Sequence, residues 1–174
     1  MPTVQLKIAK TIIRLRYLAL MFALIASVGR AQVGDLVNGG KVGDFLPPHT
    51  WQYLQGHPLP GRRLMVLDFW ATWCAPCRES IPKLDDVAAR YSNQAVEVLG
   101  ITRESEADVR PFLRKVPMKY AVAIDVEGKL HRALPITAMP YSLILNGADK
   151  IVWRGSPDKI SDALLNKLLT KSPD

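Results

Sequence analysis

The spacing of hydrophobic residues changes abruptly near residue 75. From residue 63 to residue 71 (RLMVLDFWA) apolar side chains follow one another with little interruption, which is typical of a buried parallel strand. After Cys77 the apolar residues recur at three- and four-residue spacing, the period of an amphipathic helix. They are Ile81, Leu84, Val87, Ala88 and Tyr91. The chain is therefore predicted to turn from a strand into a helix at residues 73–77 (WCAPC).

The rest of the chain continues this alternation of strands and helices. Apolar runs of strand length occupy residues 95–103, 120–125, 141–146 and 151–154. Helical spacing predicts helices over residues 105–116, 129–134 and 160–169. An Asn146-Gly147 turn predicts a hairpin between the last two strands, whereas residues 49–63 fit either a loop or an edge hairpin. The pattern as a whole indicates an α/β domain.

Composition and charge narrow the class of protein. With 174 residues, 48% of them hydrophobic, the chain is expected to form one domain with its own core. Most of the formal net charge of +7 comes from the N-terminus, because the segment before Gln32 contains basic residues and no acidic ones. Beyond that point the two signs nearly balance, so a nucleic-acid partner is not predicted.

The N-terminal segment has the pattern of an export signal. A basic stretch ending at Arg16 leads into the apolar residues 17–28 (YLALMFALIASV). Gly29-Arg30-Ala31 follows, and its small residues suit a signal peptidase. The alternative is an uncleaved membrane anchor, since Ile12, Ile13 and Leu15 could lengthen the apolar run.

This pattern divides the chain into three predicted parts. Residues 1–31 form a signal peptide or an uncleaved anchor, residues 32–41 a flexible tether, and residues 42–171 the folded domain. In either case the domain is expected outside the cytoplasm, in the periplasm or an equivalent extracytoplasmic compartment.

Cys74 and Cys77 are the only cysteines in the chain. Outside the cytosol a disulfide between them can persist, but its four-residue loop would stabilise the fold by only about 2 kcal/mol. Two-residue spacing does favour thiol–disulfide exchange, in which one thiolate attacks a substrate disulfide and the other releases the substrate. Cys74 is expected at the start of the helix, where backbone N–H groups favour a thiolate, and is predicted to be the nucleophile. Pro76 suits this first turn, because no N–H is needed there.

Metal and cofactor sites fit these residues less well. A zinc site needs three or four protein ligands, and the histidines that could join the cysteines lie far apart in sequence, at His49, His57 and His131. Covalent haem attachment requires a histidine directly after the second cysteine, where this chain has Arg78. We therefore predict a redox-active cysteine pair that uses no cofactor and no metal.

Two stretches carry a resemblance to a known family. LDFWATWCAPC (residues 67–77), followed by a helix and later by AMPYSLIL (residues 138–145), resembles thioredoxin-fold proteins, and in particular the exported TlpA/ResA type of thiol-disulfide oxidoreductase. The resemblance covers most of residues 42–171. It implies an α/β thioredoxin fold, a central mixed sheet flanked by helices, with an extra helix and strand inserted at residues 105–125.

The same resemblance implies how the site meets its partners. Met139 and Pro140 correspond to a cis-proline loop that faces the cysteines, and the backbone of Met139 could pair with an extended substrate. Trp73, Pro76, Met139 and Pro140 are predicted to contact the substrate, a protein disulfide. A membrane protein is the expected electron donor, and the protein is expected to be a monomer.

The chain departs from the TlpA/ResA pattern at two positions. That pattern usually has a glutamate three residues after the second cysteine, where this chain has Ser80, with Glu79 one position earlier. It also tends to have asparagine where this chain has Asp68, which instead matches the buried aspartate of thioredoxin. A carboxyl group in an apolar strand should have a raised pKa, so Asp68 is predicted to accept the proton of Cys77. The alternative is a structural hydrogen bond at the strand end.

Two other functions remain as alternatives. A thiol peroxidase related to the peroxiredoxins would need a peroxide-reducing cysteine in its own pocket, and a copper-binding module would use both sulfurs as soft ligands. The spacing of Cys74 and Cys77 favours a thiol-disulfide oxidoreductase over both. A reductase is predicted, because the residues between the cysteines are uncharged and a carboxylate at Asp68 disfavours a further negative charge.

Overall fold

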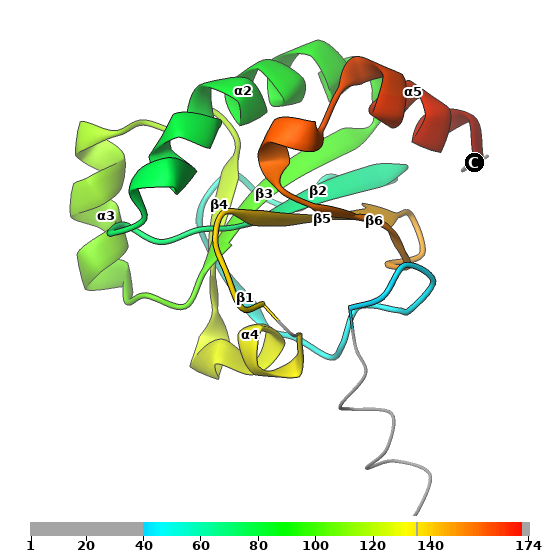
Figure 1. Ribbon diagram of the computed structural model, residues 1–174. Helices are drawn as coiled ribbons and strands as arrows, with labels where there is room; N and C mark the ends of the chain where they lie inside the picture. Colours follow the sequence, from blue (N-terminus) through cyan, green and yellow to red (C-terminus); the bar gives the residue numbers. More distant parts are fainter. Residues whose placement is uncertain (1–39, 135, 172–174) are drawn as a thin grey trace, which may run out of the picture. The chain divides into compact units, whose positions relative to one another are not determined.

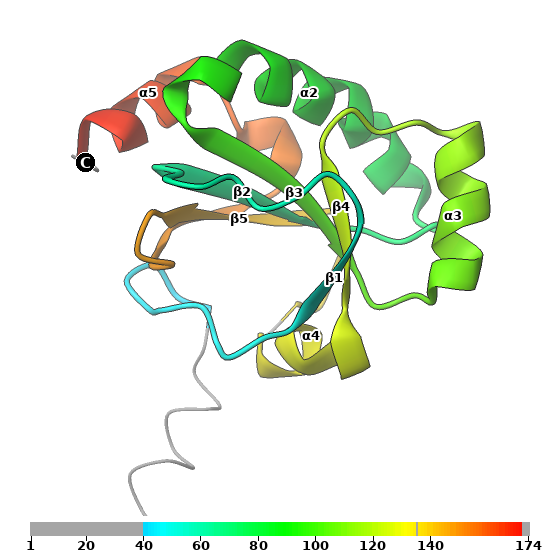
Figure 2. The same cartoon turned by 180° about the vertical axis from the view of Figure 1, so that it is seen from behind.

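The fold is a six-stranded mixed sheet with helices on both faces (Figures 1 and 2). It is seen in a computed structural model that describes residues 40–134 and 136–171. The strands are β1 (Trp51–Gln55), β2 (Leu64–Phe69), β3 (Val96–Thr102), β4 (Ala121–Asp125), β5 (Tyr141–Asn146) and β6 (Ile151–Gly155). The helices are α2 (Ala75–Tyr91), α3 (Glu106–Lys115), α4 (Lys129–Ala133) and α5 (Asp162–Lys171). The predicted α/β thioredoxin fold is confirmed.

Strand order places the junction between β2 and α2 at the middle of the sheet. The order is β1-β4-β3-β2-β5-β6, in which β2, β3 and β4 run parallel to one another, whereas β1, β5 and β6 pair antiparallel to their neighbours. The carboxyl ends of the three parallel strands therefore meet at one edge. In open α/β sheets this edge is where binding sites are usually built.

Alternating residues of β2 serve two separate cores. Leu64, Val66 and Trp70 belong to the core that also includes buried residues of α2 and α5 and Val109 of α3. Met65, Leu67 and Phe69 belong to the second core, together with Leu130 of α4. Figure 1 shows α2 and α5 on one face of the sheet and α4 on the other. Because side chains alternate along a strand, Asp68 points to the face that α2 covers.

The local signals around α2 and α3 agree with the structure. Cys74 caps α2 and Pro76 occupies its first turn, while Pro82 lies inside the helix, which continues to Tyr91. Ser105 caps α3, and its side chain accepts a hydrogen bond from the backbone N–H of Asp108.

Of two local predictions, the structure corrects the first and confirms the second. Residues 49–63 contain an edge strand, β1, paired with β4 and followed by a loop, so the segment forms no edge hairpin. The predicted hairpin between β5 and β6 is confirmed, and the left-handed residue in its turn is Asp149, with φ of 59°. The side chain of Asn146 accepts hydrogen bonds from the backbone of Ala148 and Lys150, which stabilises this longer turn.

The predictions for residues 1–31 and for most of residues 32–41 lie outside the described part of the chain. Within the described part, none of the helices combines the length and the apolar character that a membrane crossing requires.

Candidate active site

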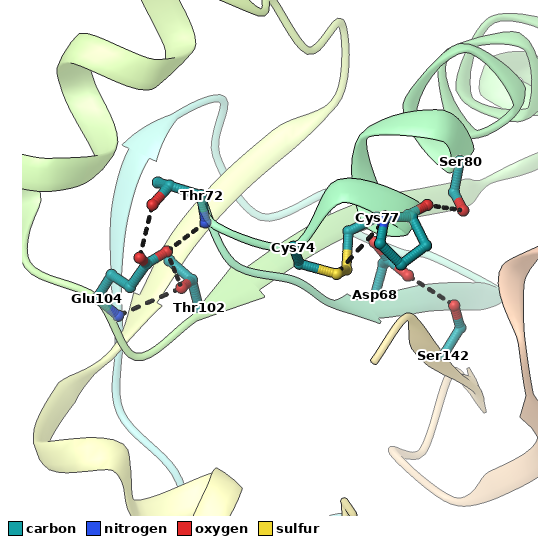
Figure 3. Close-up of a disulfide and its surroundings, with 9 residues drawn as sticks. Asp68, Thr72, Cys74, Cys77, Ser80, Thr102, Glu104 and Ser142 are labelled. Atoms are coloured by element: carbon teal, nitrogen blue, oxygen red, sulfur yellow. Dashed lines mark hydrogen bonds between the residues drawn. A yellow bond between two sulfur atoms is a disulfide. The ribbon is translucent and has the colours of Figure 1, made fainter. Parts of the chain in front are cut away.

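Cys74 and Cys77 form a disulfide at the start of α2 (Figure 3). Cys74 is the N-cap residue, with an extended backbone, and its Sγ accepts a hydrogen bond of 3.3 Å from the backbone N–H of Cys77. A sulfur at this position faces the unpaired N–H groups of the first turn, which stabilise negative charge. The local geometry therefore favours a thiolate at Cys74 once the disulfide is reduced.

Both sulfur atoms are covered in this oxidised form. Cys74 is 4% exposed and Cys77 is 2% exposed, and both belong to the core that includes Trp70 and Ile81. In the disulfide form Cys74 is therefore buried at the helix start and not open to solvent. The bond to Cys77 holds the Cys74 sulfur against the helix start, whereas Trp73, which is 68% exposed, Ala75 and Pro76 are the exposed residues of the motif.

Asp68 lies under the start of α2, on the sheet face that α2 covers (Figure 3). The residue is 1% exposed, and the hydroxyl of Ser142 donates a hydrogen bond of 2.8 Å to its Oδ1. Burial raises the pKa of the Asp68 carboxyl to about 7, and the hydrogen bond from Ser142 only partly offsets this rise. Asp68 can therefore gain or lose a proton near neutral pH, as a proton acceptor for a thiol requires.

Glu104 braces the loop that carries the cysteines, although no motif in the sequence points to it. Its carboxylate accepts hydrogen bonds from the backbone N–H of Thr72, at 2.6 Å, and from the Thr72 hydroxyl, at 2.7 Å. The hydroxyl of Thr102 donates to the same carboxylate at 3.3 Å. Figure 3 shows Glu104 beyond Thr72, on the opposite side of the disulfide from Asp68. This contact ties the loop after β3 to the loop two residues before Cys74.

The peptide bond between Met139 and Pro140 is cis, in agreement with the family resemblance. This cis-proline loop has a pocket on each side. Trp73 and Met139 line one pocket of about 250 Å³, which we call the Trp73 pocket. Pro76 and Pro140 line another of about 360 Å³, which we call the Pro76 pocket. The structure thus brings all four predicted substrate-contact residues around one loop.

Glu79 and Ser80 also line the Pro76 pocket, outside the core that holds Asp68. Glu79 is exposed, and the hydroxyl of Ser80 donates to the backbone oxygen of Pro76 at 3.3 Å. Neither side chain is buried on the sheet face under α2 as Asp68 is, so Asp68 remains the better candidate for the proton acceptor.

The histidines are not gathered at the cysteines. Within the described residues, no three His, Cys, Asp or Glu side chains group as ligands for a metal ion would. His49 bonds to the backbone oxygen of Pro47 and His57 to that of Pro58. His131 instead pairs with Asp125 and contributes to the wall of the Trp73 pocket.

Comparison with known families places this geometry in context. The model of the AhpC/TSA family matches residues 51–154, which is more than half of the chain and includes the cysteine pair and the cis-proline loop. The chain belongs to the AhpC/TSA family. Within that match lie β2, the start of α2 and the lining residues of the Trp73 pocket, whereas the Pro76 pocket also includes Ser156 and Asp158, just beyond it.

Individual relatives carry related names. The chain is 28% identical over 110 residues to the thiol-disulfide oxidoreductase ResA of Bacillus thuringiensis, covering 63% of this chain and 64% of that protein. It is also 28% identical over 153 residues to ResA of Oceanobacillus iheyensis, covering 79% of each chain. The chain thus spans somewhat less than two thirds of the first of these relatives.

Solved structures agree on the fold. A protein from Chlorobium tepidum, named as a candidate thiol:disulfide interchange protein DsbE, superposes with a TM-score of 0.60 at 27% identity, covering 76% of this chain and 99% of that one. The thioredoxin domain of an oxidoreductase from Bacteroides vulgatus superposes with a TM-score of 0.62 at 19% identity, covering 78% and 100% of the two chains. The second of these supports the thioredoxin fold alone.

Proposed function

We propose that this protein is an extracytoplasmic thiol-disulfide oxidoreductase that reduces disulfide bonds in proteins. The observation that carries the proposal is the Cys74–Cys77 disulfide at a helix N-terminus, on the sheet face that also holds a buried carboxyl with a pKa of about 7. The similarity to proteins named ResA and DsbE supports the same activity.

The reaction begins with the reduced protein. The Cys74 thiolate attacks one sulfur of a substrate disulfide, forming a mixed disulfide and releasing the other substrate sulfur as a thiolate. Cys77 then passes its proton to Asp68 and attacks the Cys74 sulfur, which releases the second substrate sulfur. One protein dithiol is thereby oxidised for each substrate disulfide that is reduced. A membrane-bound dithiol donor would restore the reduced form by the reverse exchange.

The substrate would lie across the cis-proline loop. A loop of this kind can pair through its backbone with an extended segment, as in strand addition. Trp73 and Met139 on one side, and Pro76 and Pro140 on the other, then contact the substrate residues that flank its cysteine.

The electrostatics favour reduction over oxidation. The Cys74 sulfur is stabilised as a thiolate by the helix start, but an ionised Asp68 on the same face opposes a further negative charge. A moderately stabilised thiolate gives a less oxidising disulfide than a strongly stabilised one. Strong oxidants of this fold have potentials near −120 mV and thioredoxin is near −270 mV. We expect a potential closer to the thioredoxin value, measured by equilibration with a redox standard; a value near −120 mV would overturn the assignment as a reductase.

The roles of the two cysteines are tested by alkylation and trapping. After reduction, Cys74 is expected to react with iodoacetamide below pH 8 much faster than Cys77, as read by mass spectrometry of the labelled peptides. The Cys77→Ser variant is expected to accumulate a mixed disulfide with a protein substrate, whereas Cys74→Ser should form none. Equal labelling, or faster labelling of Cys77, would reverse the assignment.

A further inference from the structure

A second buried carboxyl, Asp125, holds a histidine at the edge of the Trp73 pocket. Oδ2 of Asp125 accepts hydrogen bonds from Nδ1 of His131, at 2.7 Å, and from the backbone N–H of His131, at 2.9 Å. Oδ1 accepts a third from the backbone N–H of Leu130, at 3.0 Å. The ring of Phe69 meets the imidazole edge-on, with centroids 5.1 Å apart. The orientation of the His131 ring is therefore fixed from two sides.

The bond to Asp125 also decides what His131 presents to the pocket. A carboxylate only accepts hydrogen bonds, so Nδ1 must carry the proton, and Nε2 of the neutral ring has a free lone pair. Among the described residues, none forms a hydrogen bond with Nε2. This atom is also absent from the fully buried side-chain atoms without a partner, so it is not completely covered. Since His131 lines the Trp73 pocket, Nε2 is an acceptor at its wall.

The surroundings of His131 keep its imidazole neutral, so Nε2 remains an acceptor. Burial is the main cause that lowers the pKa of His131 from its usual value, and the Arg103 guanidinium adds to the effect, although Asp125 opposes it. The ring is thus neutral at pH 7. Arg103 and Glu104 both line the same pocket. Their opposite charges nearly cancel, so the pocket favours neither a cationic nor an anionic occupant, and a neutral side chain fits it.

We propose that His131 is a specificity-determining residue, which accepts at Nε2 a hydrogen bond from a neutral donor side chain adjacent to the reacting cysteine of the substrate. The inference rests on the proposed reductase function. It assigns Asp125 as the positioning residue that fixes the tautomer and orientation of His131. Amide and hydroxyl side chains are the class of donor that fits, and the pocket of about 250 Å³ is large enough for one such side chain.

The test compares two peptides that differ in one side chain. Short peptides carry one cysteine as a mixed disulfide with 5-thio-2-nitrobenzoate, with either Gln or Met before the cysteine, and in a second pair after it. Gln and Met are similar in size, but only Gln donates a hydrogen bond. The reduced Cys74 thiolate attacks the peptide sulfur and expels coloured thionitrobenzoate, after which Cys77 displaces the peptide thiol. At one of the two positions we expect the Gln peptide to react about tenfold faster than the Met peptide.

Matched variants distinguish loss of the Nε2 acceptor from a general effect of substitution on the fold. In His131→Asn the shorter amide can still donate to Asp125 but does not reach the place of Nε2, so the ratio of the two rates should fall to about one. In His131→Gln the longer amide reaches that place, and part of the preference should return. His57→Asn, at an exposed histidine in the loop after β1, should keep the full preference.

The pH dependence of the ratio adds a readout that a purely structural role would not move. Protonation turns Nε2 from an acceptor into a donor, so the bond from the Gln NH₂ group is lost as the pH drops through the lowered pKa of His131, and the ratio of the two rates should change there. The charged groups around the imidazole are Asp125 from β4, with Arg103 and Glu104 from the loop after β3. Any effect of these groups, or of Cys74, acts on both peptides and largely cancels in the ratio.

The outcomes are distinct for the two proposals. Equal rates with Gln and Met in the unaltered protein, or a preference that survives His131→Asn, would overturn the role of His131 and leave the reductase function standing. Failure of the reduced protein to attack any of the peptides would overturn the reductase function, and the role of His131 with it.

Discussion

Asp68 and Asp125 are equally buried, each only 1% exposed, yet their surroundings differ. Asp68, under α2, accepts one hydrogen bond in the structure, from the hydroxyl of Ser142. Asp125, beside α4, accepts three, from the ring and backbone of His131 and from the backbone of Leu130. The exposed fractions of the two residues are the same, so the two carboxyls differ in the number of hydrogen-bond donors around them.

The difference suits the two groups to different tasks. A buried carboxylate with few donors is costly when charged, and for this reason the pKa of Asp68 is raised to about 7. A carboxylate with three N–H donors is well compensated and acts as a structural brace. The first arrangement allows a proton to be taken up and released, whereas the second fixes the helix start and ring next to it.

The largest expected effect comes from Asp68→Asn in the oxidised protein. The native pKa of about 7 lies above the ordinary value of 3.8, so the folded state holds a proton that the unfolded state has lost between these values. Stability from this group is therefore lost as the pH rises from about 4 to about 7. The variant cannot ionise at this position, so its free energy of unfolding relative to the unaltered protein should increase across this range. The difference should reach about 4 kcal/mol by pH 8. Urea titrations at several pH values measure this gain, and a difference that does not change with pH would contradict it.

The same substitution at the other site should have the opposite sign. In Asp125→Asn one oxygen becomes an NH₂ group, which must face an N–H donor of His131 or Leu130. Two buried N–H groups that face each other without an acceptor cost about 1–3 kcal/mol. The variant should therefore unfold at a lower urea concentration at every pH. Asp86→Asn, at an exposed site on α2, serves as the control and should change stability by less than about 0.5 kcal/mol. A gain in stability in Asp125→Asn would remove the distinction between the two sites.

A smaller effect is expected from Ser142→Ala. The hydroxyl stabilises the ionised form of Asp68, so its removal should raise the pKa of that carboxyl further, by up to about one pH unit. Infrared or carbon NMR titration of the Asp68 carboxyl detects the shift directly. Ser80→Ala is the matched control, because that hydroxyl bonds to the backbone of Pro76. A lowered pKa in Ser142→Ala would show that the hydroxyl does not favour the charged carboxyl.

The sequence was sufficient for features that depend on local pattern. Hydrophobic spacing placed the β2–α2 junction and with it the position of Cys74 at the start of the helix. The identity of Asp68 and its apolar neighbours was enough to predict a raised pKa, because burial on both sides of a central strand follows from the pattern. Pro140 was placed by family resemblance, since no local pattern reports a cis peptide bond.

Features that depend on distant contacts were missed. β1 has a mixed polar and aromatic pattern, and it becomes a strand by pairing with β4, about seventy residues away. Glu104 meets Thr72 only because neighbouring parallel strands bring their loops together. Burial of the Cys74 sulfur likewise depends on core packing around the disulfide. The Asp125–His131 pair was the exception that local reasoning could have found, because a strand-end Asp six residues before a helical His is within reach as a cap.

The most direct test of Asp68 as the proton acceptor is the rate at which Cys77 resolves a mixed disulfide on Cys74, followed against pH in a single turnover. In the unaltered protein we expect this rate to rise with pH, with an inflection near neutrality, as the Asp68 carboxyl ionises. Asp68→Asn should slow resolution by about a hundredfold and remove the inflection, while the initial attack by Cys74 continues. An unchanged rate and pH profile in Asp68→Asn would contradict the assignment and leave the carboxyl with a structural role only.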